Sequence, residues 1–389
     1  MKKLIALLLA ICLIGSLAAC APSDADTEGG YKVAMITDYG DITDQSFNQT
    51  TWEAVQAFGA ANNIPVKYYK PTTNDNAGRI ASVEGAIADG YNVIVMPGYA
   101  FGATIYEVQD DYPNVKFIAL DVAEFDIYDC FYNHDESGNQ TGLIDENNQP
   151  HLSKNVYCAI YQEEISGYMA GYAAVKLGYE KLGFLGGMAV PAVIRFGYGY
   201  VQGANDAAKE MDKTVSIKYA YGNQFFGDAD ITGVMDTWYG NGTQVVFACG
   251  GGIYTSAAEA AKKVGGKVIG VDVDQAATID GIYGEGMTIT SAMKGLYPTT
   301  VDTLTDVIIN GKWETYSGKI VTLGMVSGTD ASANYVQLGK TQFAEGKFTE
   351  ADYTALAAAI FNGTVTISGD TTTEPTTTNA TVEYLGNLK

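Results

Sequence analysis

Short apolar runs alternate with helical patterns along most of this chain, beginning at Tyr31. The runs are rich in β-branched residues and end at Gly or Asp, as is typical of parallel strands that are covered on both faces. Regular alternation of such strands with helices predicts a doubly wound α/β fold. We expect strands at 32–37, 66–69, 92–97, 115–121, 155–161, 181–187, 215–221, 244–250, 267–272 and 287–293, and helices at 48–61, 78–90, 163–177, 198–210, 254–264 and 298–310.

The number of expected strands suits two sheets better than one. Without its N-terminal leader, the chain still has about 370 residues, which exceeds the usual size of a single core. We place the first break near 150–155, where the polar segment 128–153 ends. This segment holds both histidines and resembles a calcium-binding loop, but Ile144 stands where the closing Glu should be, so we expect no metal site.

The first residues have the pattern of a secretory signal. Two lysines precede an apolar run over 4–17, which is too short for a comfortable membrane span, and small residues follow. An ordinary signal peptide would account for this pattern. The end "LAAC" also resembles a bacterial lipobox, which predicts a signal peptide over 1–19, a lipid on Cys20 and a flexible tether over 20–30. The mature protein would then be held at the outer face of a bacterial cell membrane.

Charge and cysteine content exclude several classes of protein. The formal charge is −22 and the pI is about 4.3, so nucleic-acid binding is not expected. Three cysteines remain in the mature chain besides position 20, and their spacing matches neither a zinc site nor a disulfide framework. The possibility of one disulfide among these three cysteines stays open. The Thr-rich C-terminal extension, 366–389, is predicted to form a surface linker or an edge strand.

Aspartates end three of the expected strands. In open α/β sheets ligands bind at the carboxyl ends of the strands, and Asp38, Asp121 and Asp272 stand there. The glycine-containing strand ends at 98–99 and 250–252 stand there too. A single Asp at such a place is more often a helix cap or a turn residue. Three of them in separate units leave both interpretations open.

The turn 38–48 contains more polar side chains than a simple connection needs. Ser46 and Gln49 fit a capping box at the start of the next helix, which needs no ligand. Phe47 lies outside the helical spacing of the expected core residues Trp52, Val55 and Phe58. It is either a hydrophobic staple or a platform on which a flat ligand stacks. We interpret Asp41 and Asp44 as turn residues.

Other motifs point to binding and not to catalysis. Phe196 is a second candidate aromatic, while the glycines near it do not have dinucleotide-binding spacing. Asp272 and Lys294 could together bind vicinal hydroxyl groups, or could be a surface ion pair. Neither a Ser-His-Asp nor a Cys-His arrangement is apparent. We therefore expect a protein that is not an enzyme and uses no cofactor.

The sequence also resembles a known family. "TDYGDITDQSFNQTTWEA" is similar to the T-D-x-G-x-x-x-D-x-S-F-N-Q-x-x-W-E-G motif of the basic membrane protein (BMP) family. The likeness continues through "YPNVKFIALD", "YQEEISGYMAGYAA", "LGFLGGMAVPAVIRFGYGYVQGA" and "GVDVDQ", in order over about 31–310. Members of this family are lipoprotein solute receptors of ABC importers, and those characterised bind purine nucleosides.

This resemblance implies a role for each matching residue. It assigns the two faces of a nucleobase to Phe47 and Phe196. It assigns the polar edges of the base to Asp38, Asn48 and Asp121, and the ribose to Asp272, Lys294 and Gly250. "CGGGIYTS" departs from the family's usual A-G-G-x-G, and 128–153 is longer than expected, so the choice of base stays open.

The same resemblance implies a fold with two doubly wound α/β lobes, a hinge and a cleft, as in type I periplasmic binding proteins. Lobe one would comprise 31–153 plus about 290–322, and lobe two 154–289 plus about 323–365. We expect a monomer that delivers nucleosides to an ABC permease. The alternatives are a pentose or hexose receptor, a nucleoside hydrolase and a sugar-binding type of transcription regulator.

Overall fold

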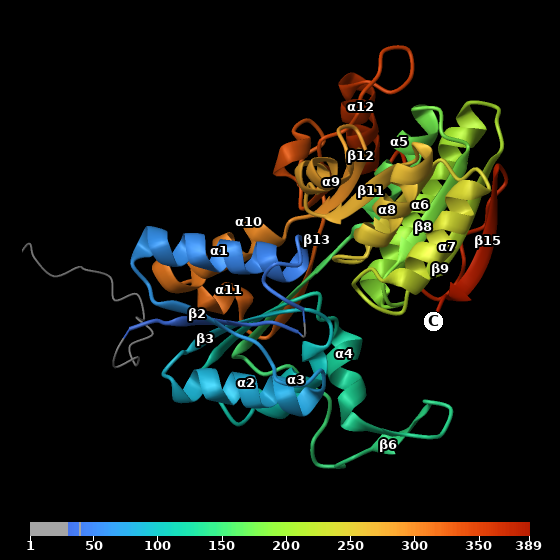
Figure 1. The fold of residues 1–389 in the computed structure, drawn as a ribbon. Coiled ribbons are helices and arrows are strands. Elements are labelled where there is room, and N and C mark those ends of the chain that lie inside the picture. The colour runs from blue at the N-terminus through green and yellow to red at the C-terminus, as the bar shows by residue number, and fades with distance from the viewer. Residues whose placement is uncertain (1–29, 39) are drawn as a thin grey trace, which may run out of the picture.

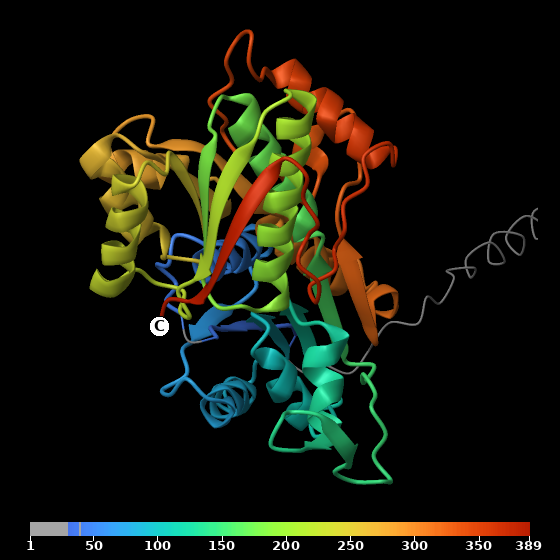
Figure 2. The ribbon, with the colours of Figure 1, turned by 90° about the vertical axis from the view of Figure 1, so that its right-hand side faces the viewer.

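The protein consists of two α/β lobes, one above the other (Figures 1 and 2). The computed structural model describes residues 30–38 and 40–389. The predicted signal peptide, the lipid site at Cys20 and nearly all of the tether lie outside the described residues. Within the described part of the chain, no helix is both long and apolar enough to cross a membrane.

Lobe one is built on a six-stranded parallel sheet in the order β13-β7-β4-β3-β1-β2. Every residue of β1 and β3 is buried, because helices cover both faces of the sheet. Its strands are β1 (Val33–Ile36), β2 (Val66–Tyr69), β3 (Val93–Pro97), β4 (Lys116–Leu120), β7 (Val156–Tyr161) and β13 (Lys319–Leu323). Its helices are α1 (Phe47–Asn62), α2 (Asn76–Ala88), α3 (Phe101–Val108), α4 (Glu124–Tyr128), α10 (Leu296–Leu304) and α11 (Trp313–Tyr316).

Lobe two repeats this plan with seven strands in the order β14-β12-β11-β10-β8-β9-β15, of which only β14 runs antiparallel to its neighbour. Its strands are β8 (Lys181–Gly186), β9 (Val215–Tyr221), β10 (Val245–Cys249), β11 (Lys267–Asp272), β12 (Thr288–Lys294), β14 (Val336–Leu338) and β15 (Ala380–Asn387). Its helices are α5 (Glu163–Lys176), α6 (Pro191–Glu210), α7 (Ala229–Gly240), α8 (Tyr254–Val264), α9 (Ala276–Tyr283) and α12 (Glu350–Phe361). The predicted two-lobed α/β class is confirmed.

The chain crosses between the lobes at points that differ from the predicted boundaries. Residues 154–161 are predicted in lobe two, but β7 pairs with β4 in lobe one. Residues 290–294 are predicted in lobe one, but β12 pairs with β11 in lobe two. The apolar pattern identifies a strand and not the sheet it joins, so pairing decides both cases.

The three crossings lie side by side and form the hinge. Gln162 N donates to Leu323 O at 3.0 Å, Gly295 N to Tyr335 O at 2.7 Å, and Tyr335 N to Gly324 O at 3.0 Å. A Cβ on Gly324 would stand 1.7 Å from Gln162 Oε1, so a larger residue there would displace the Gln162 side chain. The backbone hydrogen bonds join the crossings, and these few residues at the ends of strands and helices are where a hinge between the lobes would bend.

Two peripheral segments extend the lobes. Within 128–153, β5 (Tyr132–His134) and β6 (Gln140–Leu143) form a hairpin that projects from lobe one (Figure 1). The C-terminal extension ends in β15, which pairs with β9, so the predicted edge strand is confirmed (Figure 2). Cys130, Cys158 and Cys249 are free thiols in the structure.

Candidate functional site

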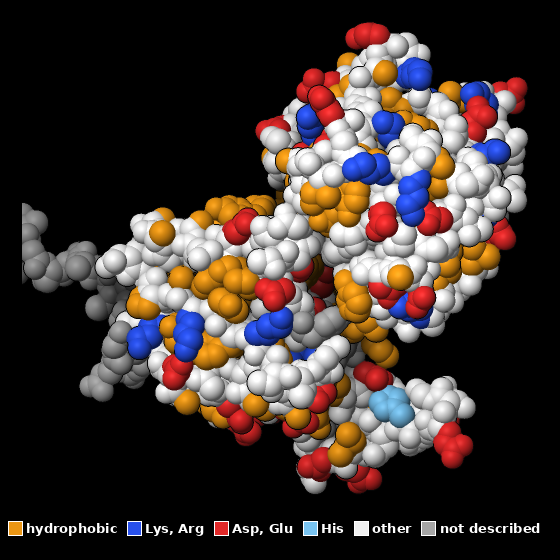
Figure 3. Space-filling view, in the orientation of Figure 1, with side chains coloured by type: hydrophobic (Ala, Val, Ile, Leu, Met, Phe, Trp, Pro, Cys, Tyr) orange, Lys and Arg blue, Asp and Glu red, His pale blue; other side chains and the backbone are white. Residues whose placement is uncertain are grey.

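A cleft of about 430 Å³ lies between the lobes, where the carboxyl ends of both sheets meet. Figure 3 shows acidic side chains inside the hollow between the two bodies. All of the residues predicted to contact a ligand line this cleft: Asp38, Phe47, Asn48, Asp121, Phe196, Gly250, Asp272 and Lys294. The structure thus brings the predicted set together in one place.

The turn before α1 is organised by Asp44. Its carboxylate accepts hydrogen bonds from the backbone N–H groups of Ser46, Asn48 and Gln49 at 2.9–3.1 Å. The predicted capping box is therefore wrong: Ser46 occupies the N-cap position, but its hydroxyl does not cap the helix. Instead Ser46 Oγ donates to Asp272 Oδ2 in the other lobe, at 2.6 Å.

Asn48 is oriented by two acidic neighbours. Its Nδ2 donates to Asp38 Oδ1 at 3.1 Å and to Asp44 Oδ2 at 3.0 Å. Its Oδ1 is buried and has no hydrogen-bond partner among the described residues. Asp121 Oδ1 is a second buried acceptor of this kind. Buried polar atoms are rarely left unpaired, so these two oxygens are suited to receive donors from a ligand.

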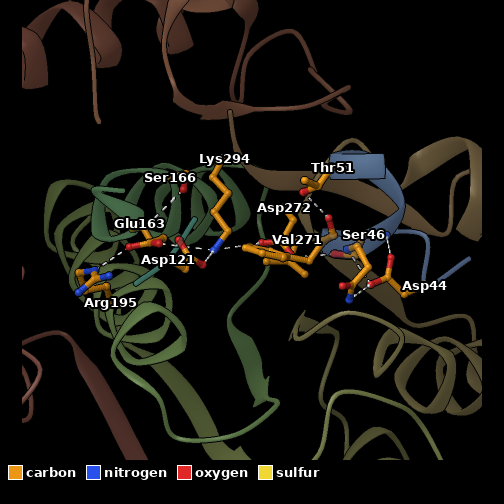
Figure 4. Close-up of polar contacts among 12 residues, drawn as sticks. Asp44, Ser46, Thr51, Asp121, Glu163, Ser166, Arg195, Val271, Asp272 and Lys294 are labelled. Carbon is orange, nitrogen blue, oxygen red and sulfur yellow. Dashed lines mark hydrogen bonds and ion pairs between the residues drawn. The ribbon is translucent and has the colours of Figure 1, made fainter. Parts of the chain in front are cut away.

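A buried cluster of charged groups forms the floor of the cleft (Figure 4). The ammonium of Lys294 bonds to Asp121 and lies 3.5 Å from Glu163 Oε1 and 3.7 Å from Asp272 Oδ1. Arg195 Nε donates to Glu163 Oε2 at 2.6 Å. Asp121 comes from lobe one and the other four come from lobe two, so the cluster spans the two lobes.

Burial controls the protonation of this cluster. Desolvation raises the pKa of Asp121 to about 7, although the Lys294 charge opposes this shift. Burial also raises the pKa of Asp272 against the same cation. For Lys294, burial acts against the charge, but the three carboxylates outweigh it and raise the pKa of the ammonium. Lys294 is therefore a permanent cation at neutral pH.

The backbone at two of these acids is strained. Asp121 has a φ of 61° and Asp272 a φ of 65°, in the left-handed region that non-glycine residues rarely adopt. Such strain persists where surrounding structure over-determines it, and it concentrates at functional sites. Both residues follow directly on buried strand residues, so the left-handed turn directs their carboxylates into the cleft.

Aromatic rings surround the Lys294 ammonium. Its Nζ lies 4.8 Å from the ring centroid of Phe47, 5.6 Å from that of Phe196 and 5.7 Å from that of Tyr161. Phe196 is only 1% exposed and packs edge-on against Phe247. The two predicted stacking rings therefore face one region of the cleft, which the ammonium borders.

Gly250 makes room for a further aromatic residue. A Cβ on Gly250 would lie 2.9 Å from the backbone of Gly187 and 3.1 Å from Phe225 Cδ1. Phe225 itself lines the cleft. The turn 250–252 thus lies close against Gly187 and Phe225, and Phe225 is the aromatic residue that lines the cleft beside it.

Sequence reasoning does not identify Ser46, Glu163, Arg195 or Phe225 as parts of the site. Local spacing makes Ser46 a helix cap. Glu163 opens α5, where an acidic residue is favoured by the helix dipole with or without a ligand. One signal is available for Glu163 and Arg195: both lie within the stretches that carry the family resemblance.

Next to Glu163, the carboxyl group of Glu164 makes stability depend on pH. It is 7% exposed, its Oε2 has no partner among the described residues, and burial raises its pKa to about 7. A raised pKa means that the folded state holds a proton that the unfolded state has already lost between about pH 4.5 and 7. The contribution of Glu164 to stability is therefore full below about pH 4.5 and is lost as the pH rises through 7.

We expect Glu164→Gln to raise the free energy of unfolding by about 2 kcal/mol at pH 8 and to change it little at pH 4.5. Urea denaturation at both pH values measures this. The control is Glu180→Gln, because Glu180 lies at an exposed ion pair with Lys213. An equal effect of Glu164→Gln at both pH values would contradict the assignment.

Comparisons with known proteins find relatives over most of this chain. The family described as "ABC transporter substrate-binding protein PnrA-like" matches residues 31–330. A Lactococcus lactis protein named "ABC transporter nucleoside-binding protein BmpA" is 28% identical, over 90% of this chain and 99% of its own length. "Basic membrane protein B" of Borreliella afzelii is 27% identical, over 84% of this chain and 88% of its own length.

Solved structures show the same fold. An ABC transporter solute-binding protein from Aeropyrum pernix superimposes with a TM-score of 0.63 at 18% identity, over 86% of this chain and 87% of its own. Another ABC transporter solute-binding protein, from Conexibacter woesei, superimposes with a TM-score of 0.61 at 20% identity, over 87% of this chain and 99% of its own.

Proposed function

Because this chain belongs to the PnrA-like family of ABC transporter substrate-binding proteins, we propose that it captures purine nucleosides in its interlobe cleft and delivers them to an ABC importer. The nucleoside-binding name of the Lactococcus lactis relative supports this proposal. So does the chemistry of the cleft, which combines aromatic rings with unpaired acceptors and a buried ion cluster.

The observation that carries the proposal is the pair of unpaired acceptors beside a ring. Asn48 Oδ1 and Asp121 Oδ1 are buried and unpartnered among the described residues, and Phe47 borders the same cleft. A nucleobase offers flat faces to a ring and N–H donors at its edge. Stacking on an aromatic side chain contributes about 1–3 kcal/mol per base. Unpaired acceptors reject an analogue that lacks the donors.

The ribose is assigned to the lobe-two side of the cleft. Asp272 accepts from Ser46 through Oδ2, and its Oδ1 faces the Lys294 ammonium at 3.7 Å. A base that enters between Phe47 and Phe196 displaces this ammonium from the rings toward Asp272. The carboxylate would then accept from a sugar hydroxyl while the ammonium donates to its neighbour.

The remaining parts of the proposal concern the membrane. A lipid on Cys20 would hold the protein on the extracytoplasmic face of the cell membrane, beside the permease that receives the ligand. The acidic surface argues against nucleic acid as a partner. We propose that the chain works as a monomer, with lobe closure about the hinge near Gln162, Gly295 and Gly324 as its conformational change.

Mass spectrometry of the small molecules released from purified, denatured protein tests the function directly. We expect a nucleoside. Calorimetry with adenosine, guanosine, inosine, uridine and ribose then ranks the ligands, and purine nucleosides should bind most tightly. A released hexose, or free ribose formed from inosine, would contradict the proposal.

Phe47→Ala should weaken every nucleoside by about tenfold or more, because one stacking face of the base is lost. Phe47→Tyr keeps the ring and should restore most of the affinity. Phe361→Ala, which removes a half-exposed ring on α12, serves as the control. Calorimetry measures all three variants. Unchanged affinity in Phe47→Ala would remove Phe47 from the site.

A further inference from the structure

Gln45 connects the two lobes outside the cleft. Its backbone oxygen accepts from Gln275 Nε2 at 3.1 Å, and its side-chain Oε1 accepts from Thr278 Oγ1 at 3.0 Å. Gln275 and Thr278 lie at the start of α9 in lobe two, whereas Gln45 precedes α1 in lobe one. None of the three residues lines the cleft.

The lobe-two partner is fixed in its orientation. Gln275 is 1% exposed, its Oε1 accepts from Val271 N at 3.0 Å, and its own N–H donates to Ser291 Oγ. With the amide oxygen used inside lobe two, the amide nitrogen donates to Gln45 O across the lobes at 3.1 Å and to Gly251 O in lobe two at 3.5 Å. Val271 directly precedes Asp272, so the same contact also holds the end of β11 in place.

The lobe-one partner is fixed as well. The backbone N–H and the Nε2 of Gln45 both donate to Gln49 Oε1, at 3.0 and 2.7 Å. This leaves the Oε1 of Gln45 directed at Thr278. The backbone of Gln45 has a φ of 56°, a strained value for a non-glycine residue. Strain of this kind persists where contacts on both sides hold the residue.

The connection stands next to the residues assigned to the ligand. Ser46, which follows Gln45, donates to Asp272, and Phe47 and Asn48 come next in the chain. When the lobes separate, the bonds of Gln45 to Gln275 and Thr278 break together with the Ser46–Asp272 bond. These contacts therefore form only when both halves of the cleft are in place.

We propose that Gln45, Gln275 and Thr278 are positioning residues that form a latch and set ligand affinity by favouring the closed arrangement of the lobes. This inference rests on the proposed function only for the identity of the ligand. When only a fraction of the free protein is in the closed state, its apparent affinity for the ligand is reduced by that fraction. Each lost hydrogen bond of the latch should thus lower affinity by about threefold to tenfold.

Two variants remove the lobe-to-lobe bond of the Gln45 side chain without touching the cleft, Thr278→Val and Gln45→Ala. Thr278→Ser keeps the hydroxyl and should behave as the unmodified protein. Thr237→Val and Gln56→Ala are matched controls, because the Thr237 hydroxyl donates to Gly233 O within α7 and Gln56 is exposed on α1.

The first measurement needs no ligand. Dyes placed through unnatural amino acids at the exposed positions Ala60 and Glu259, one on each lobe, report closure by single-molecule energy transfer in the full chain. We expect Thr278→Val and Gln45→Ala to shift the ligand-free population toward the open state, with unchanged thermal unfolding temperature. Unchanged energy transfer in both variants would overturn the latch.

The second measurement uses adenosine, guanosine and inosine as probes. The same variants should lose affinity by one common factor for all three, mainly through faster dissociation, because the latch does not contact the ligand. A loss confined to one nucleoside would overturn the proposal in favour of direct contact. If the unmodified protein bound no nucleoside, the proposed function would fail while the energy-transfer result still decided the latch.

Discussion

Replacing Lys294 with methionine should abolish nucleoside binding and lower the free energy of unfolding at neutral pH by about 3–5 kcal/mol. Lys294 is 5% exposed and is the cation that faces Asp121, Glu163 and Asp272 together. Without it, three buried carboxyl groups face one another, and among the described residues Arg195, beside Glu163, is the cation left to offset them. Removing one partner of a buried ion cluster leaves the remaining charges without a counter-ion and without water to solvate them.

The destabilisation should shrink as the pH falls. The pKa of Asp121 is already raised to about 7 with the lysine present, and loss of the cation raises it further. The folded variant then takes up protons between about pH 7 and 4, where the unfolded carboxylates are still ionised, so its stability rises as the pH is lowered. Urea unfolding at pH 5 and 7.5 measures this difference.

Lys213→Met is the matched control, since Lys213 forms an exposed ion pair with Glu180 and should contribute less than about 1 kcal/mol. Stability of Lys294→Met equal to that of the control at pH 7.5 would contradict the buried-cluster interpretation. Nucleoside affinity equal to that of the control would place Lys294 outside the binding site.

Strand ends and helices can be predicted from the sequence because their signals are local. The carboxyl end of a parallel strand is a place in the chain, so the residues alone predict that Asp38, Asp121 and Asp272 stand at the ligand-binding ends of their strands. The structure places all three in the cleft. That Asp38 and Asp121 lie in one lobe and Asp272 in the other follows from the topology of the chain. The family resemblance implies this topology, but the residues alone do not.

Partners far apart in the sequence cannot be predicted in this way. Ser46 and Asp272 are 226 residues apart, and a helix cap is the best interpretation of Ser46 that local spacing offers. A serine at the start of a helix can form either a capping box or a hydrogen bond to the other lobe, so its type and position do not distinguish the two. The same holds for β7 and β12, whose apolar residues suit either sheet until their neighbours are known.

The structure also decides which substitutions can distinguish contacts to the base from contacts to the ribose. The family resemblance assigns Asp121 to the base, and Lys294 with Asp272 to the ribose. In the structure Lys294 bonds to Asp121 and lies over the rings of Phe47 and Phe196. A substitution at Lys294 therefore disturbs both halves of the site and cannot test the ribose assignment.

Asp272→Asn is the substitution that tests it. Asparagine keeps an oxygen that can accept from Ser46 Oγ, so the contact across the lobes survives while the charge is lost. Hydrogen bonds to a carboxylate are roughly twice as strong as those to a neutral acceptor. We expect nucleosides to bind about 100-fold more weakly and the free bases adenine and guanine to change by less than about threefold.

Calorimetry with each nucleoside and its free base measures this contrast within one variant, so a general loss of folding cannot imitate it. Asp236→Asn, which removes an exposed acid on α7, is the control and should leave both affinities unchanged. Equal losses for nucleoside and base would move Asp272 from the ribose to the base. Because Asp272 accepts from Ser46 and faces Lys294 at 3.7 Å, such a result would also reverse the direction in which the ligand lies in the cleft.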